Sequence, residues 1–450
     1  MPNNLMLLLT SLTIAMVGSG IWVTTKDIRH PALLYTAVWV IILCLCSLPV
    51  IRYPETSALT LIIISLSALT FSLASLIGSA IPWGFHKDSV TQEQAGKYLP
   101  STVFLSLLVV IGIFAGLYYY QSKFGLATLL SNPGYVRYTD RDGSGFYGFL
   151  LLLPSFSIIA LALRWLLTRK NSWGTASVMI FAYTYFAVLP ERTTVIANTL
   201  WIVGMWVILD KRFQRKILKY VLFTLVGFSV LLTFFIIVND RTGKNVFFDT
   251  IGYAIKYENL PTPFISPYIY VTGSIPALST LISDPDTSDF GYKLDRTMFP
   301  FARVIQLISQ SQESKLSESE DAAFIPFYFN TYTWLSLPIR DQGVIGSQLY
   351  VFLVGLLAGL IYRAAKATRK PLWTFLYGGV FSAILLSGMT NRFSSLTWWV
   401  AAAFALIILA SPQMGWKIRG IRFLRFPINS LHLKAQKIIK LSKNNLNKSH

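Results

Sequence analysis

Residues 58–83 read ALTLIIISLSALTFSLASLIGSAIPW, twenty-six consecutive positions without a charged side chain. A bilayer core is about 30 Å thick, and an α-helix that rises about 1.5 Å per residue needs roughly 20 apolar residues to cross it. The composition of the whole chain points the same way, since 54% of its 450 residues are hydrophobic and only 13% are charged. A soluble domain carries roughly 25% charged residues. The stretch is therefore predicted to be a membrane-spanning helix.

Ten further apolar stretches have a comparable length: 5–24, 32–51, 101–121, 145–168, 174–190, 193–209, 218–238, 345–364, 371–390 and 395–412. The first has no positive charge before it, so we expect an uncleaved helix rather than a signal peptide. The sixth and seventh stretches of the chain are short and separated only by Glu191 and Arg192. They form two spans or one re-entrant hairpin. The sequence thus predicts an all-α integral membrane protein with about 11 transmembrane helices.

Basic residues are concentrated on one side of this predicted bundle. The net charge is +19, and 25 of the 39 Lys and Arg residues fall in alternate short loops and in the tail after residue 412. Short cytoplasmic loops are enriched in Lys and Arg, so this side is predicted to be cytoplasmic and to hold the C-terminus. The tail alternates bases with apolar residues, which favours anionic lipid over nucleic acid as its partner. The expected location is the cytoplasmic (inner) membrane.

The predicted spans divide the chain into four parts. They are an N-terminal bundle of about eight helices (1–238, with an external loop at 122–144), a loop domain (239–344), C-terminal helices (345–412) and a basic tail (413–450). The loop domain has eight bases and twelve acids and many aromatic residues. We expect it to form a small helical cap on the outer surface, because a structureless loop of this length is uncommon. Its aromatic rings suit sugars, or they belong to an interfacial aromatic belt.

Charged residues at the outer ends of predicted spans are candidate binding residues. Arg192 begins a predicted helix, where free N–H groups and the helix dipole favour an anion, and its guanidinium fork suits a phosphate or pyrophosphate. A Glu191–Arg192 pair that caps a hairpin is the alternative. Arg137 and Arg141, beside two acids in loop 122–144, bind an anion or pair within the loop. Arg392, in a short external turn, is a similar candidate or an interfacial anchor.

Several external stretches carry a family resemblance. They are YVTGSIPA (270–277), FNTYTW (329–334) and RDQGVIG (340–346), together with 135–143 and the helix start at Arg192. The chain resembles the Wzy-type polymerases of O-antigen and capsular oligosaccharide repeat units, whose late external loop reads roughly N-x-Y-T followed by D-x-G-x-x-G. The resemblance covers the predicted topology of nearly the whole chain, and recognisable motifs only in these stretches.

The resemblance implies a glycosyltransferase that joins undecaprenyl-pyrophosphate-linked oligosaccharides on the outer face of the cytoplasmic membrane, for O-antigen or capsule synthesis. The lipid-linked donor and acceptor, membrane lipid and a protein that sets chain length are the partners it implies. The pyrophosphate leaving group already activates the donor, and the sequence has no nucleotide-binding fingerprint, so no cofactor is expected. No Asp-x-Asp motif lies on the predicted outer face, so we expect metal-independent chemistry.

Carried onto this sequence, the resemblance makes Arg192 the first choice for contact with the pyrophosphate, with Arg137 and Arg141 second. Asp341 or Glu191 is the candidate general base. For Asp341 the alternative is turn and helix-capping chemistry ahead of the ninth span. Four further residues are candidate substrate contacts: Asn330, Tyr332, Tyr270 and Arg392.

Two other functions stay open. A flippase or other transporter of lipid-linked oligosaccharides is expected to have short loops throughout and charges buried mid-span, unlike this chain. An O-antigen ligase is associated with an external histidine, whereas all four histidines here fall on the predicted cytoplasmic side: His30, His86, His432 and His450. A polymerase is therefore the favoured reading.

Overall fold

The protein is described by a computed structural model that covers residues 3–82, 99–139, 146–168, 173–189, 192–210, 252–256, 262–283, 294–302 and 323–410, with isolated positions between them. The predicted tail 413–450, and all but isolated positions of the predicted span 218–238, lie outside the described residues. So do the candidate residues Glu191 and Arg141. The backbone of Arg137 and Arg192 is described, but their side chains are not.

Each predicted span within the described residues contains a helix. These helices are α1 (Asn3–Thr25), α2 (Pro31–Ser47), α3 (Ala58–Ala80), α5 (Thr102–Lys123), α8 (Phe146–Thr168), α9 (Trp173–Val188), α10 (Arg192–Leu209), α16 (Ser336–Thr368), α17 (Pro371–Leu385) and α18 (Leu396–Ala405). The shorter elements are α6 (Leu126–Ser131), α7 (Pro133–Thr139), α13 (Thr262–Thr272), α14 (Ser274–Ser283), β1 (Ala323–Phe324), β2 (Tyr328–Phe329), two 3₁₀ turns (Gly252–Ala254 and Arg392–Ser394) and a π-helical turn (Leu406–Ala410).

Six helical stretches among the described residues are long and apolar enough to cross a membrane: Asn3–Thr25, Ala58–Ala80, Thr102–Lys123, Leu150–Thr168, Phe264–Ser283 and Ser336–Thr368. Five shorter apolar helices accompany them. The prediction of an all-α, multi-pass membrane protein is confirmed at this level. The total of about eleven spans and the orientation stay predictions.

One of the six stretches was not predicted as a span. Phe264–Ser283 lies within the loop domain and consists of α13 and α14, which are separated at Gly273. Both helices pack against the ends of other helices: Tyr268 donates to the carbonyl oxygens of Leu45 (2.8 Å) and Leu48 (3.0 Å) at the end of α2. In α14, the Ser279 hydroxyl accepts from the backbone N–H of Ser57 just before α3 (2.8 Å).

The helix starts follow local chemistry that the sequence carries. Ser57, Ser101 and Ser395 precede α3, α5 and α18, and each side chain accepts a hydrogen bond from a backbone N–H in the first turn. Serine is a favoured residue at this position because it satisfies an N–H that has no partner within the helix. Pro31 and Pro371 occupy the first turns of α2 and α17, where a missing N–H costs nothing.

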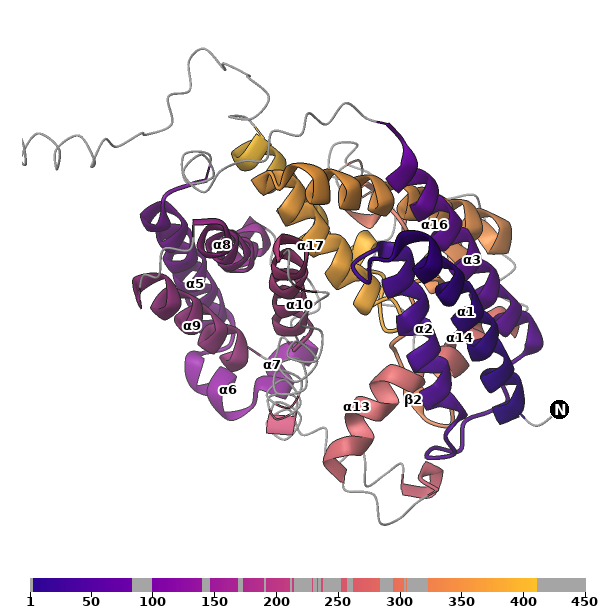
Figure 1. Cartoon of the computed structure of the whole chain (residues 1–450). Coiled ribbons are helices and arrows are strands. Elements are labelled where there is room, and N and C mark those ends of the chain that lie inside the picture. Colours follow the sequence, from indigo (N-terminus) through magenta and orange to yellow (C-terminus); the bar gives the residue numbers. More distant parts are fainter. Residues whose placement is uncertain are drawn as a thin grey trace, which may run out of the picture. The chain divides into compact units, whose positions relative to one another are not determined.

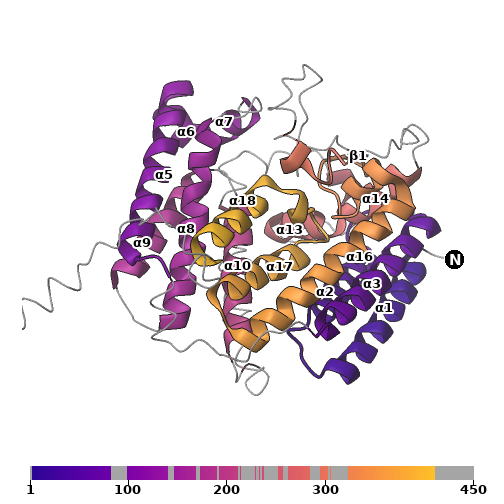
Figure 2. The same ribbon diagram turned by 90° about the horizontal axis from the view of Figure 1, so that it is seen from above.

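Helices α3 and α16 pack side by side along much of their length (Figures 1 and 2). Glycines allow the close approach. A Cβ atom added at Gly355 would lie 2.7 Å from the carbonyl oxygen of Phe71, and one at Gly359 would overlap the carbonyl oxygen of Ser75. In α3, a Cβ atom at Gly78 would meet the backbone of α16 in turn. Small residues at such spacing are typical of helix pairs packed within membranes.

A second group of helices is built around α10, which packs against α8 and α17. The indole nitrogen of Trp201 donates to the carbonyl oxygen of Phe375 (2.7 Å), and Ser382 donates to that of Ala197 (2.9 Å). Toward α8, Ser155 donates to the amide oxygen of the buried Asn198 (2.7 Å). These hydrogen bonds satisfy polar groups that would be costly to bury unpaired in a lipid-facing bundle.

Helices α10 and α16 end at the same place. Arg29, in the turn between α1 and α2, donates to the carbonyl oxygen of Asp210 after α10 (3.4 Å), and Tyr362 of α16 donates to Asp27 in that turn (2.6 Å). We call this the Asp27 end of the bundle. Both helices therefore begin toward the opposite end, which we call the Asp341 end. The charge distribution predicts that the Asp27 end is cytoplasmic.

Candidate functional site

Three of the stretches that carry the family resemblance meet at the Asp341 end. The ring of Tyr270 in α13 lies 6.0 Å from that of Phe329 in β2. A Cβ atom at Gly273 would lie 3.1 Å from the same Phe329 ring, so α13 and the 323–329 hairpin are in direct contact. The guanidinium of Arg340 lies 5.2 Å from the ring centre of Tyr332, a cation–π distance. Tyr270 and Phe329, which are 59 positions apart in the chain, are thus brought together.

Asp341 is anchored rather than free. It is 4% exposed, and its Oδ2 atom accepts hydrogen bonds from the backbone N–H groups of Arg296 (3.0 Å) and Thr297 (2.6 Å). The carboxylate therefore fixes residues 294–302 against the start of α16. A general base must reach the proton that it removes, and this arrangement occupies one carboxylate oxygen. A structural role is visible for Asp341, and a role as a base stays a prediction.

The ninth predicted span is preceded by a helical segment that the sequence did not predict. Helix α16 begins at Ser336, nine residues before the predicted start at 345, and the Asp341 carboxylate in this segment accepts from the backbone N–H groups of Arg296 and Thr297. A break follows at Gly343, whose backbone angles (φ 68°, ψ −173°) are not helical. Such angles are accessible essentially only to glycine. Asp341 therefore lies in a short helical segment of its own, directly before the long part of α16.

The predicted substrate contacts differ in accessibility. Asn330 is exposed, Tyr270 is half-buried and Tyr332 is 5% exposed, so Asn330 is the most available of the three. Arg392 lies in the 3₁₀ turn Arg392–Ser394 between α17 and α18 and is half-buried. Of the arginine candidates, Arg192 is the first residue of α10, and Arg137 lies in α7.

A polar set beside Arg392 was missed from the sequence. Trp334 donates from its indole nitrogen to Tyr35 (2.9 Å) and from its backbone to the carbonyl oxygen of Ser387 (2.8 Å). Tyr350 of α16 donates to the amide oxygen of Asn391 (3.2 Å), which is 6% exposed. The signal available in the sequence was weak: Asn391 and Tyr350 are polar residues at the edge of, or within, predicted spans.

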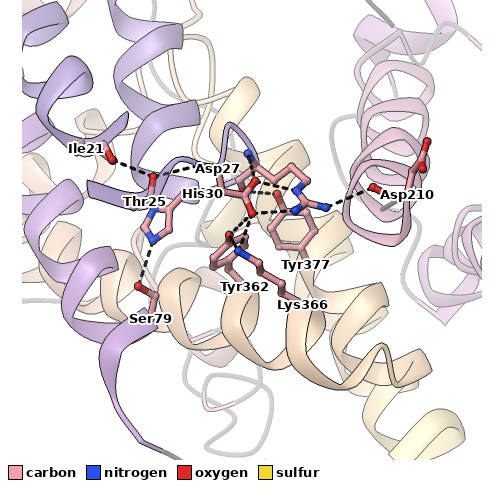
Figure 3. Close-up of polar contacts among 10 residues, drawn as sticks. Ile21, Thr25, Asp27, His30, Ser79, Asp210, Tyr362, Lys366 and Tyr377 are labelled. Atoms are coloured by element: carbon pink, nitrogen blue, oxygen red, sulfur yellow. Dashed lines mark hydrogen bonds and ion pairs between the residues drawn. The ribbon is translucent and has the colours of Figure 1, made fainter. Parts of the chain in front are cut away.

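The densest polar cluster among the described residues lies at the Asp27 end (Figure 3). The buried carboxylate of Asp27 pairs with Arg29 (Nε to Oδ1, 2.8 Å) and with Lys366 (Nζ to Oδ2, 2.8 Å). It also accepts from Tyr362, while Tyr377 donates to the carbonyl oxygen of Arg29 (2.6 Å). The cluster therefore ties the α1–α2 turn to α16 and α17. No sequence motif marks this cluster, since its residues are far apart in the chain.

Titration at the Asp27 end follows from this geometry. Burial opposes ionisation of Asp27, but its hydrogen bonds to Arg29, Lys366 and Tyr362 outweigh that effect and hold its pKa well below the usual range. His30, the N-cap of α2, has its pKa lowered to about 4 by burial. The imidazole is therefore neutral at pH 7. Its Nδ1 atom accepts from the N–H of Ala32 (3.2 Å), so Nε2 donates to the hydroxyl of Ser79 (3.1 Å).

Within the described ranges, no group of three or more His, Cys, Asp or Glu side chains is placed to hold a metal ion. Comparison of the chain with protein-family models, curated proteins and solved structures finds no match.

Proposed function

We propose that the protein is a membrane glycosyltransferase that polymerises undecaprenyl-pyrophosphate-linked oligosaccharide repeat units at the Asp341 end, on the outer side of the cytoplasmic membrane. The observation that carries the proposal is the meeting of three motif-bearing stretches at that end: Tyr270 contacts Phe329, and Arg340 covers Tyr332. The helices α10 and α16 also run in the same direction, so Arg192 begins its helix toward this end.

The chemistry fits a donor that carries its own leaving group. When the glycan leaves its carrier, negative charge develops on the pyrophosphate, and preorganised positive groups lower the barrier. Arg192, at a helix N-terminus, is the residue proposed for that role. The acceptor hydroxyl of the incoming repeat unit attacks the anomeric carbon and loses its proton to a carboxylate, for which Glu191 becomes the first candidate because Asp341 is held by backbone N–H groups.

The test is Arg192→Ala in the native strain, with surface glycan resolved on a gel and protein abundance measured on a membrane blot. Arg52→Ala is the matched control, because Arg52 is exposed, lies at the far end of α2 from Asp27 and belongs to none of the motifs. We expect the Arg192 variant to reduce the polymer ladder to a single repeat at normal abundance, while the control keeps the ladder. An unchanged ladder would remove Arg192 from the mechanism.

The roles of Asp341 can be separated by two substitutions. Asp341→Asn keeps a side-chain oxygen for the N–H groups of Arg296 and Thr297 but cannot act as a base, whereas Asp341→Ala loses both properties. If Asp341 only anchors residues 294–302, the Asn variant should keep the polymer ladder and the Ala variant should lose it. If Asp341 is the general base, both variants should lose the ladder.

A flippase is the alternative function. Deletion of the gene distinguishes the two, because lipid-linked single repeats accumulate on the outer leaflet when polymerisation fails and on the inner leaflet when flipping fails. Accumulation inside would overturn the polymerase proposal.

A further inference from the structure

The hairpin that carries β1 and β2 has one buried and one exposed face. The two strands pair antiparallel, with Ala323 opposite Phe329 and Phe324 opposite Tyr328. Ala323 and Phe329 are buried, and β1 packs against α14 (Figure 2). Phe324 and Tyr328 are 60% and 74% exposed. Residues opposite each other in an antiparallel pair point to the same side, so the outer face of the hairpin presents two aromatic rings.

The two rings contact each other, and an amide lies on the same side. The ring centroids of Phe324 and Tyr328 are 5.6 Å apart, with 73° between the ring planes. Along the second strand and just beyond it the side chains alternate: Tyr328 is exposed, Phe329 is buried and Asn330 is exposed again. Successive side chains of an extended chain point to opposite sides, so the Asn330 amide shares the face of the two rings.

This face does not lie against acyl chains. Within the described residues the sheet has two strands, so each strand has an outer edge that takes no part in the ladder. Open sheet edges that face lipid do not occur within the hydrocarbon core, because their backbone groups have no partner there. An amide is also costly to bury there without a partner. The ring pair is therefore expected outside the hydrocarbon core, where exposed aromatic surface indicates a binding site.

A sugar ring fits these groups. The C–H groups on the face of a pyranose ring pack on the negative face of an aromatic ring. Its hydroxyl groups need polar partners, and the Asn330 amide offers both donors and an acceptor. The hairpin leads directly into the stretch that holds Tyr332, whose ring is covered by Arg340. The rings and the amide therefore continue the surface at which the motif-bearing stretches meet.

We propose that the exposed face of the hairpin is a glycan-binding platform, in which Phe324 and Tyr328 stack on sugar rings and Asn330 hydrogen-bonds a sugar hydroxyl. The inference rests on the proposed function and deepens it, because it names the part of the substrate held here: the oligosaccharide rather than the pyrophosphate. The platform keeps the glycan at the Asp341 end between additions. Its loss should therefore shorten the polymer without abolishing it.

The test measures the affinity of the purified full chain, in nanodiscs, for oligosaccharides prepared by partial hydrolysis of the native strain's surface glycan. The test variant is Phe324→Ala with Tyr328→Ala, and since both side chains are exposed, neither truncation opens a cavity. The matched control is Phe114→Ala with Tyr118→Ala in α5, where the same two residue types have the same spacing and are 66% and 63% exposed. We expect roughly tenfold weaker binding in the test variant and wild-type binding in the control.

Further variants separate a glycan from a membrane surface as the occupant. Phe324→Tyr with Tyr328→Phe keeps both ring faces and should bind like the wild type, whereas Asn330→Ala should bind more weakly. No binding by the wild type, or equal affinity in the wild type and the double alanine variant, would overturn the proposal. Rings that anchor in the membrane interface would leave glycan affinity unchanged and lower the unfolding midpoint of the double alanine variant in nanodiscs, which would also overturn it.

Failure of this inference and failure of the proposed function give different results. If the protein is a polymerase without this platform, deletion of the gene removes the polymer ladder, but the double alanine variant keeps both its glycan affinity and a full-length ladder. If the polymerase proposal is wrong, deletion leaves the ladder intact or leaves lipid-linked repeats on the inner leaflet. The platform is judged in either case by the affinity of the double alanine variant against its control.

Discussion

Because α3 and α16 pack with their backbones in direct contact, adding one methyl group at Gly359 should push the two helices apart. In Gly359→Ala, the new Cβ atom would overlap the carbonyl oxygen of Ser75 and lie 2.8 Å from the backbone nitrogen of Ser79. Ordinary contact begins at 3.4 Å. Both neighbours are backbone atoms, so no side-chain rotation relieves the overlap, and one helix must move by several tenths of an ångström or more.

The magnitude follows from two opposing effects. Overpacking a close contact costs about 1–3 kcal/mol, whereas alanine gains up to about 1 kcal/mol over glycine in a helix. Gly20→Ala in α1 isolates the second effect, because a Cβ atom there has nothing within 4 Å. The two variants should therefore differ by about 1–3 kcal/mol in the free energy of unfolding, with Gly359→Ala the less stable.

The assay is thermal unfolding of the two purified variants in one detergent, followed by loss of the monodisperse peak on size exclusion. At about 2.1 cal/mol/K per residue, a chain of 450 residues shifts its midpoint by roughly 1 °C per kcal/mol. Gly359→Leu should extend the loss, since a larger side chain cannot be placed there. Equal midpoints for Gly359→Ala and Gly20→Ala would refute the close packing of α3 on α16.

Three further predictions concern single residues. Asp27→Ala leaves Arg29 without its buried partner and should lower the free energy of unfolding by about 3 kcal/mol. Adding Lys366→Ala to this variant should reduce the loss only slightly, because Lys366 is 47% exposed. Thermal unfolding of the two single variants and the double variant measures both effects. His30 has a folded pKa of about 4, below its ordinary 6.5, so the unfolded chain takes up the proton first and stability should fall as the pH drops from about 6.5 to 4. His30→Asn keeps a helix cap and should flatten this part of a stability–pH curve; an unchanged slope would contradict the assignment. Gly343→Ala should lower the free energy of unfolding by about 1–3 kcal/mol, because alanine is strained at φ 68°, ψ −173°. The unfolding midpoint measures this loss, and an unchanged midpoint would argue against the break in α16.

The helices could be predicted from the sequence because apolar length is a local property. Residues 58–83 show this: α3 covers Ala58–Ala80, and its N-cap is the serine directly before it. The helix pair α13–α14 was not predicted as a span, since its mean hydropathy of 1.2 is low and Gly273 interrupts it. The short helical segment before Gly343 was not predicted for a related reason: it holds Arg340 and Asp341, and charged residues favour the prediction of a loop over that of a span.

The candidate site was less predictable because its contacts are long-range. The motif at 340–346 drew attention to Asp341, but nothing near it in the sequence indicates that Arg296 and Thr297 supply its hydrogen bonds. The Asp27 cluster has the same character. Its carboxylate meets Lys366 across more than three hundred residues, so the sequence shows only a base-rich loop and a base-rich helix end.

The two parts of α16 make different contacts, and each part has the residues that its contacts need. At the Asp27 end, Tyr362 and Lys366 hold a buried carboxylate, and Gly355 and Gly359 press the helix against α3. That part of the helix is fixed along its length. The segment that carries Asp341 is separated from it by the break at Gly343, so its orientation is set by residues 294–302 and by Tyr332. A single continuous helix would force Arg340 and Asp341 to follow the packing of the span, whereas the break at Gly343 lets contacts at the Asp341 end determine where these two residues lie.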